Sequence, residues 1–135
     1  MNCIFCKIIS KDIPCHIVYE DDHSFAFLDA RPINPGHTLV IPKKHSENLH
    51  SIEEADLKEV IATVQKIANA VREVTSASGI NIGQNNGASA GQAVFHTHFH
   101  VIPRNTKDGL KSWHRDNPDI SNQGEIAERI QKLLA

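Results

Sequence analysis

The stretch "FHTHFHVIPR" at residues 95–104 constrains this chain more than any other part of its sequence. It places three histidines, His96, His98 and His100, at alternate positions. Successive side chains of a strand point to opposite faces, so a strand over 93–103 predicts that the three imidazoles share one face. Histidine titrates near neutral pH, and such a cluster indicates proton transfer, nucleophilic attack or metal binding. The opposite face carries the residues expected to pack on the core: Phe95, Thr97, Phe99 and Val101.

Residues 51–75 form the clearest predicted helix. Apolar residues recur at helical spacing from Leu57 to Val74, and Ser51 with Glu54 three residues later forms a capping box. Shorter segments predict four more strands, at 16–22, 24–30, 37–45 and 80–85, and a C-terminal helix at 125–134. We therefore expect an α+β fold in which an antiparallel sheet is accompanied by one long helix and a C-terminal helix.

The length of 135 residues fits a single domain over 1–135, large enough to bury a core. The net charge of −2 argues against a dedicated nucleic-acid binder, which would carry a basic stripe. No apolar run has the length of a membrane span, and the N-terminus does not read as a signal peptide. These features predict a cytoplasmic protein with no membrane and no nucleic-acid polymer as partner.

The histidine stretch also has a recognisable pattern. "HTHFHVI" fits alternating histidines followed by apolar residues, and "GQAVFHTHFHVIPR" closely resembles the signature of the histidine triad (HIT) superfamily. Further similarity in "CIFCKIISKDIP" and "IGQNNGASAGQ" extends the resemblance over about residues 3–104. The chain looks most like the Hint-like branch, while the tail 105–135 carries no family signature. The resemblance implies a HIT-like fold.

The resemblance implies a nucleotide-binding hydrolase that cleaves nucleoside monophosphate conjugates of the purine nucleoside phosphoramidate type. His98 matches the nucleophile, which attacks the α-phosphorus and forms a covalent nucleotidyl-histidine intermediate. His100 matches the histidine that hydrogen-bonds the phosphate, and His37 matches a histidine that supports the triad. Gln92 matches the phosphate-facing loop and completes the expected catalytic set.

The resemblance also implies a nucleotide-binding set. Asp29 matches the acid that holds the ribose hydroxyls, although a turn residue is the alternative reading. Asn85 matches a contact to the phosphate or leaving-group side, and Gly91 and Ala93 belong to the phosphate-facing loop. Some Hint proteins have serine at the position of Ala93, so its hydroxyl contact is missing here. The match to the apolar base pocket, for which plain core packing is the alternative, comprises Phe5, Ile8, Ile13, Phe27 and Val94.

Cys3 and Cys6 form a Cys-x-x-Cys pair, whose spacing suits zinc. The resemblance implies that His45 and His96 supply the remaining two ligands of a structural Zn²⁺. A redox pair or two packing thiols are the alternatives. Cys15 has no partner motif and is expected to pack.

Three alternative functions remain open from the sequence. The three histidines could instead bind a catalytic zinc in a metallohydrolase. The other two rivals are a dinucleoside polyphosphate hydrolase and a non-enzymatic nucleotide-binding sensor. The resemblance also implies a homodimer joined through the long helix and a strand, and Trp113 and His114 are expected in a surface loop.

Overall fold

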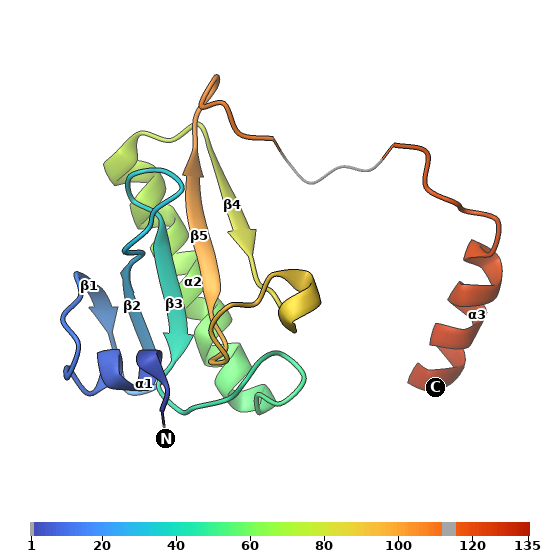
Figure 1. The fold of residues 1–135 in the computed structure, drawn as a ribbon, viewed down its shortest axis with the longest axis horizontal. Coiled ribbons are helices and arrows are strands. Elements are labelled where there is room, and N and C mark those ends of the chain that lie inside the picture. The colour runs from blue at the N-terminus through green and yellow to red at the C-terminus, as the bar shows by residue number, and fades with distance from the viewer. Residues whose placement is uncertain (1, 112–115) are drawn as a thin grey trace.

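The computed structural model describes residues 2–111 and 116–135, so Trp113 and His114 lie outside the described residues. The helices are α1 (Ile4–Ile9), α2 (Glu54–Thr75), the short 3₁₀ helix η1 (Ala88–Ala90) and α3 (Gln123–Leu134). The strands are β1 (Ile17–Glu20), β2 (Ser24–Leu28), β3 (Thr38–Pro42), β4 (Gly79–Gly83) and β5 (Phe99–Arg104). They form one antiparallel sheet in the order β1-β2-β3-β5-β4 (Figure 1). The expected α+β fold is confirmed.

One face of the sheet is covered by α2. Buried residues at helical spacing, from Val60 to Val71, contact inward side chains of the central strands. Val40 of β3 and Val101 of β5 lie in this layer and are fully buried. Ile61 and Val74 belong to the same periodic run in the sequence, but they are exposed. The buried stripe of α2 is therefore narrower than its apolar sequence predicts.

The other face of the sheet is only partly covered, by the short helix α1. Phe5 and Ile8 of α1 pack on Phe27, Leu39 and Ile41, which alternate with the α2-facing residues along their strands. The helix reaches β2 and β3 and leaves the β5 side of this face open (Figure 1). The site histidines lie on this open side because His100 pairs with Leu39 across β3 and β5.

The sequence did not predict α1. Its six residues are too few to show a helical period, and its N-cap is Cys3, whose sulfur accepts from the Cys6 amide. The capping box at the start of α2 was also wrong. The N-cap is Glu53, with no side-chain cap bond, and Ser51 instead accepts from the amides of Glu47 and Asn48.

The strand expected over 93–103 begins only at Phe99. Residues 94–96 form a bend, which turns the chain before it enters the sheet. Phe95, expected to pack on the core, is 46% exposed, whereas Phe99 and Val101 are buried as expected. Thr97 is also buried, and its amide donates to the carbonyl of Ser46. The bend explains why the face alternation fails upstream of β5.

The tail runs away from the sheet and ends in α3, which stands apart from the rest of the chain (Figure 1). Every described residue from 116 to 135 is exposed. Among the described residues, no helix combines the length and apolar character needed to cross a bilayer.

Candidate active site and candidate metal centre

The ring of His98 is held in one orientation by a backbone group. Its Nδ1 lies 2.7 Å from the carbonyl oxygen of His96, an atom that can only accept, so Nδ1 carries the proton. The other nitrogen, Nε2, is then the basic one. Burial lowers the pKa of His98 below its ordinary value. At neutral pH the structure therefore presents an uncharged imidazole with a free lone pair, as a nucleophile requires.

A chain of hydrogen bonds fixes the protons of His37 and His100. The amide of Ile33 donates to Nδ1 of His37 at 3.0 Å, so the proton of a neutral His37 lies on Nε2. That Nε2 lies 2.9 Å from Nδ1 of His100 and donates to it. The proton of His100 is thereby placed on Nε2. His100 thus offers an N–H donor beside His98, whose ring centroid is 5.1 Å away.

Both His37 and His100 are uncharged at neutral pH. Burial, reinforced by the charges that His98 and His37 would carry, lowers the pKa of His100 to about 4. Burial also lowers the pKa of His37, while the nearby Asp29 carboxylate opposes that shift. Oδ2 of Asp29 lies 3.5 Å from Nε2 of His37. The site therefore places two neutral imidazoles and one carboxylate around the nucleophile candidate.

An apolar cavity of about 640 Å³ adjoins the histidines at Asp29. Its walls come from α1, from the segment that follows it and from the end of β2, and Asp29 supplies a carboxylate at one edge. Oδ1 of Asp29 accepts from the amide of Arg31, which fixes the carboxylate and leaves Oδ2 toward His37. Three of the five expected base-pocket residues line this cavity: Ile8, Ile13 and Phe27.

The other two expected base-pocket residues lie elsewhere. Phe5 is buried behind the cavity, with its ring centroid 5.5 Å from Phe27 and 5.2 Å from the ring of His98. Val94 lines a different cavity, next to Cys3 and His45. Phe5 and Val94 nevertheless pack in the same apolar cluster as Ile8 and Phe27, and their place in the base pocket stays a prediction.

The loop before the histidines is braced from within by Gln92. Its Oε1 accepts from the amide of Gly87, and its Nε2 donates to the carbonyls of Glu47 and Val94. The side chain is 4% exposed, so its amide is turned into the protein rather than toward a substrate. Gln92 was expected in the catalytic set; in the structure its side chain braces the loop, and a part in catalysis stays a prediction.

The outer part of this loop carries the remaining expected phosphate contacts. Gly91 has a φ of +91°, a conformation that L side chains rarely adopt. Its carbonyl lies 3.5 Å from Nδ2 of Asn85, so the two residues face each other. Ala93 is exposed, and its amide makes no hydrogen bond with any described residue. The loop therefore has an amide group available to an anion.

A second cluster joins the start of the histidine stretch and the segment after β3 to α1. Nδ1 of His96 lies 3.4 Å from Sγ of Cys3, 3.6 Å from Sγ of Cys6 and 3.2 Å from Nδ1 of His45. Sγ of Cys6 lies 3.4 Å from Nδ1 of His45. A tetrahedral zinc with Zn–N bonds of about 2.0 Å and Zn–S bonds of about 2.3 Å separates its ligand atoms by about 3.3–3.8 Å, and the observed distances lie within about 0.1 Å of this range. These spacings fit a single zinc ion held by Cys3, Cys6, His45 and His96.

The donor chemistry of the cluster agrees with its spacing. Nε2 of His96 donates to the carbonyl of Pro42 at 2.8 Å, which leaves the lone pair on Nδ1, the atom that faces the thiols. Burial lowers the pKa of His96 to about 4, so the ring is a neutral ligand. Burial and the neighbouring Cys3 raise the pKa of Cys6 to about 11, so in the free protein this thiol holds its proton. A bound cation would favour the thiolate.

The three histidines do not converge on a single metal. His96 belongs to the cysteine cluster, and His100 groups with Asp29 and His37. His98 belongs to neither potential metal group among the described residues. The expectation that all three share one face is therefore wrong for His96, because the bend at 94–96 turns its ring toward α1. This division removes the geometric basis for a catalytic zinc that His96, His98 and His100 would hold together.

Sequence reasoning missed six of the residues that line the apolar cavity, among them two with titratable side chains. Cys15, expected to pack, and His16 both contribute to its wall. His16 also pairs its carbonyl with the amide of Leu28, which holds the segment after α1 against β2. No spacing pattern marks these positions, since only the antiparallel pairing of the two segments brings them to the cavity.

The fold and the site together define an α+β protein whose antiparallel sheet carries linked, uncharged histidines on the face that α2 does not cover. The HIT domain family matches residues 10–107. The chain belongs to the histidine triad family. A solved HIT-family structure from Bacillus subtilis is 45% identical, with a TM-score of 0.91, over 100% of this chain and 99% of that one.

Two further relatives are relevant to the His98 site and to the Cys–His cluster. The adenosine 5'-monophosphoramidase HNT1 of Candida albicans is 36% identical to this chain over 140 residues, covering 99% of this chain and 92% of its own length. A Zn-bound histidine triad family protein from Mycobacterium smegmatis is 42% identical with a TM-score of 0.78, and the match covers 99% of this chain and 96% of that one.

Proposed function

We propose that this protein hydrolyses nucleoside monophosphate conjugates of the purine nucleoside phosphoramidate type, with His98 as the covalent nucleophile. The observation that carries the proposal is the hydrogen bond from Nδ1 of His98 to the carbonyl of His96, which leaves Nε2 as the basic nitrogen. The 36% identity to a monophosphoramidase over nearly the whole chain supports the substrate class. The apolar cavity bordered by Asp29 supplies a place for the nucleoside.

The reaction has two balanced steps. In the first, Nε2 of His98 attacks the α-phosphorus, a nitrogen–phosphorus bond forms, and the bond from phosphorus to the leaving amine breaks. The amine leaves with the electron pair of that bond and gains a proton from the medium. In the second step, water attacks the phosphorus and loses a proton to the medium, the nitrogen–phosphorus bond breaks, and the nucleoside monophosphate is released. The electron pair returns to Nε2, and His98 regains its free lone pair.

The surrounding groups have distinct roles in this proposal. Nε2–H of His100 donates to a phosphoryl oxygen as negative charge develops on it, since the chain from Ile33 through His37 fixes its proton there. The free amide of Ala93 provides a second donor. The carboxylate of Asp29 accepts from the ribose hydroxyls at the mouth of the apolar cavity.

We also propose that Cys3, Cys6, His45 and His96 bind a structural zinc ion. The four donor atoms and the fixed tautomer of His96 support it, and so does the Zn-bound relative. The metal would join α1 to the bend before His98 and would take no part in the chemistry. The cytoplasmic location, the single-domain organisation and the homodimer remain predictions.

The first experiment is mass spectrometry of the protein quenched during turnover of adenosine phosphoramidate. We expect an added adenylyl group on the peptide that contains His98. The variant His98→Ala should lose both the adduct and turnover, whereas His50→Ala, an exposed histidine, should retain both. Turnover that survives in His98→Ala would contradict the nucleophile assignment.

Two further substrates separate the rival functions. Faster turnover of a dinucleoside polyphosphate than of adenosine phosphoramidate would favour the polyphosphate hydrolase alternative. Tight binding of adenosine monophosphate without turnover of either conjugate would favour the nucleotide-binding sensor. Both outcomes would contradict the proposed activity while leaving the family assignment intact.

A further inference from the structure

The turn that carries His37 has few amide donors. Residues 29–37 connect β2 to β3, and two of them, Pro32 and Pro35, have no amide proton. The amide of Ile33 nevertheless lies 3.0 Å from Nδ1 of His37, and this contact sets which ring nitrogen of His37 carries the proton. The side chain of Ile33 is 52% exposed and gives its backbone little support. The turn therefore needs an anchor outside itself.

Asn34 connects this turn to the far end of β5. Its backbone carbonyl accepts from the amide of His37 at 3.0 Å. Its side-chain nitrogen Nδ2 donates to the carbonyl of Pro103 at 2.8 Å and to Oδ2 of Asp108 at 3.2 Å. Both of these partners are acceptors, so the two protons of the Asn34 amide group are both used. The partners lie 69 and 74 positions further along the chain.

Asp108 is itself held firmly in place. Nε and Nη2 of Arg104 donate to its two carboxylate oxygens at 2.7 and 3.0 Å, a bidentate contact. The amides of Asn105 and Leu110 donate to the same carboxylate at 3.2 and 3.0 Å. The Arg104 guanidinium and these amides hold the pKa of Asp108 well below its usual range. Asp108 is therefore a fixed, charged acceptor for the side chain of Asn34.

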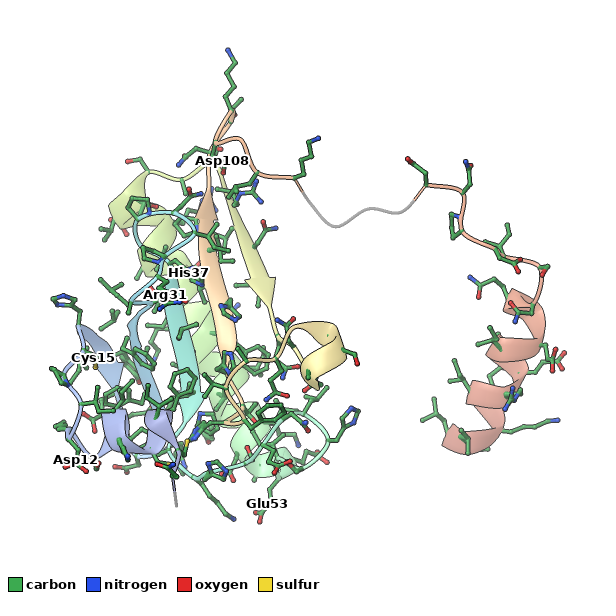
Figure 2. The ribbon with its side chains drawn as sticks, in the orientation of Figure 1. Asp12, Cys15, Arg31, His37, Glu53 and Asp108 are labelled. Atoms are coloured by element: carbon green, nitrogen blue, oxygen red, sulfur yellow. The ribbon has the colours of Figure 1, made fainter. Side chains whose placement is uncertain are left out.

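We propose that Asn34 and Asp108 are positioning residues that keep His37 bonded to His100. Figure 2 shows Asp108 beyond the end of β5 and His37 beside the start of β3. The contacts run from Asp108 through Asn34 to the turn, and from the Ile33 amide through His37 to His100. The inference rests on the proposed function for its effect on turnover, and it gives a role to a residue of the tail beyond 104.

Loss of this anchor would act on the reaction through His100. Without the side-chain bonds of Asn34, the Ile33 amide is free to leave Nδ1 of His37. The His37 ring is then no longer held against His100. Nε2–H of His100 loses its fixed direction, which weakens a donor to the phosphoryl oxygen as charge develops there. Neither Asn34 nor Asp108 lines the apolar cavity, so nucleoside binding should change little.

Nuclear magnetic resonance of the ¹⁵N-labelled full chain tests the anchor without any substrate. The Nε2 proton of His37 is buried and hydrogen-bonded, so the wild type should show its ring N–H resonance, which His37→Gln should lack. Asn34→Leu keeps the size of the side chain but removes both donors. We expect exchange of this ring proton with water to be at least about tenfold faster in Asn34→Leu.

A second variant and a matched control accompany this measurement. Asp108→Asn keeps one acceptor oxygen and should accelerate the exchange in the same direction, by a smaller factor. Asn81→Leu is the control, since the Asn81 side chain accepts from Nη1 of Arg104 at 2.6 Å but does not contact the turn. It should leave the ring resonance as in the wild type. Absence of the resonance in the wild type, unchanged exchange in both Asn34→Leu and Asp108→Asn, or equal acceleration in Asn81→Leu would overturn the proposal.

Steady-state kinetics connect the anchor to turnover. For adenosine phosphoramidate, kcat of Asn34→Leu should fall at least about tenfold while KM changes by less than about threefold. A normal kcat in a variant whose ring proton exchanges fast would overturn the link from the anchor to catalysis and leave the proposed function intact. If the wild type turns over no conjugate, the proposed function fails, and the comparison of ring resonances still tests the anchor.

Discussion

The carbonyl oxygen of His96 accepts a hydrogen bond from Nδ1 of His98 at 2.7 Å, while the ring of His96 lies among the thiols of Cys3 and Cys6. One residue therefore belongs to both clusters: its side chain is a metal ligand candidate, and its backbone orients the nucleophile candidate. Phe5, which sits between the two cysteines on α1, contacts both rings edge-on. We therefore expect the position of His98 to depend on the integrity of the Cys–His centre.

Removal of a zinc ligand should lower both metal content and stability. We expect Cys6→Ser to bind less than one equivalent of zinc and to melt at least about 5 °C below the wild type, because the centre joins α1 to the His96 bend. Cys15→Ser is the matched control, since Cys15 lies in the wall of the apolar cavity. Zinc content by elemental analysis and thermal unfolding check this. Equal zinc content in the wild type and Cys6→Ser would refute the ligand set.

Comparison of a ribose substrate with its 2'-deoxy analogue tests the proposed contact between Asp29 and the ribose. Asp29→Asn keeps an acceptor for the Arg31 amide but removes the charge. We expect kcat/KM for adenosine phosphoramidate to fall by about tenfold or more, and that for the 2'-deoxy analogue to fall much less. Asp22→Asn, at an exposed position, should change neither value. An equal loss on both substrates would show that Asp29 acts through His37 rather than on the ribose.

The free energy of unfolding should fall on acidification because His100 is buried uncharged. Its pKa in the folded chain is about 4, against an ordinary value of 6.5, so the unfolded chain binds more protons between these limits. The contribution is complete above pH 6.5 and is lost as the pH falls toward 4, with a limit on the order of 3 kcal/mol. His100→Asn should show a flatter decline between pH 6.5 and 4. Urea unfolding at several pH values gives the comparison, and identical slopes would contradict it.

Gln92 should matter for stability, in contrast to a side chain that acts only on substrate. Gln92→Glu places a carboxylate against the carbonyls of Glu47 and Val94, which now receive its two N–H bonds. We expect a loss of about 2 kcal/mol or more in the free energy of unfolding. Gln131→Glu on the exposed helix α3 serves as the control. An unchanged unfolding free energy in Gln92→Glu would contradict the bracing role of this side chain.

The turn that leads to His37 requires glycine at position 36. Gly36 has a φ of +97°, and a Cβ there would lie 2.7 Å from Cγ2 of Thr75. Gly36→Ala should therefore cost about 1–3 kcal/mol in unfolding free energy, measured by urea denaturation. Gly79→Ala meets nothing within 4 Å and has no positive φ, so it should be neutral or slightly stabilising. Equal stability of the two variants would contradict the steric argument.

Local sequence patterns identified the parts of this fold that depend on near neighbours. The periodic residues from Val60 to Val71 predicted α2, and short apolar segments predicted the strands. The resemblance around the alternating histidines led to the correct family. The capping box failed because Ser51 bonds the preceding turn instead, a choice set by the local loop rather than by the Ser–Glu spacing.

The sequence by itself determined the family, the α+β class and the residue types of both clusters. The family resemblance assigned His96 to the cysteines and His98 and His100 to the catalytic set, but only the tertiary structure supplied the physical reason for this division. Strand alternation predicts one shared face for His96, His98 and His100, but long-range contacts with Pro42 and α1 bend the chain before β5. That bend turns His96 toward the thiols and leaves His98 and His100 on the open face. Contacts between residues more than fifty positions apart carry no local sequence signal, so spacing alone could not divide the triad.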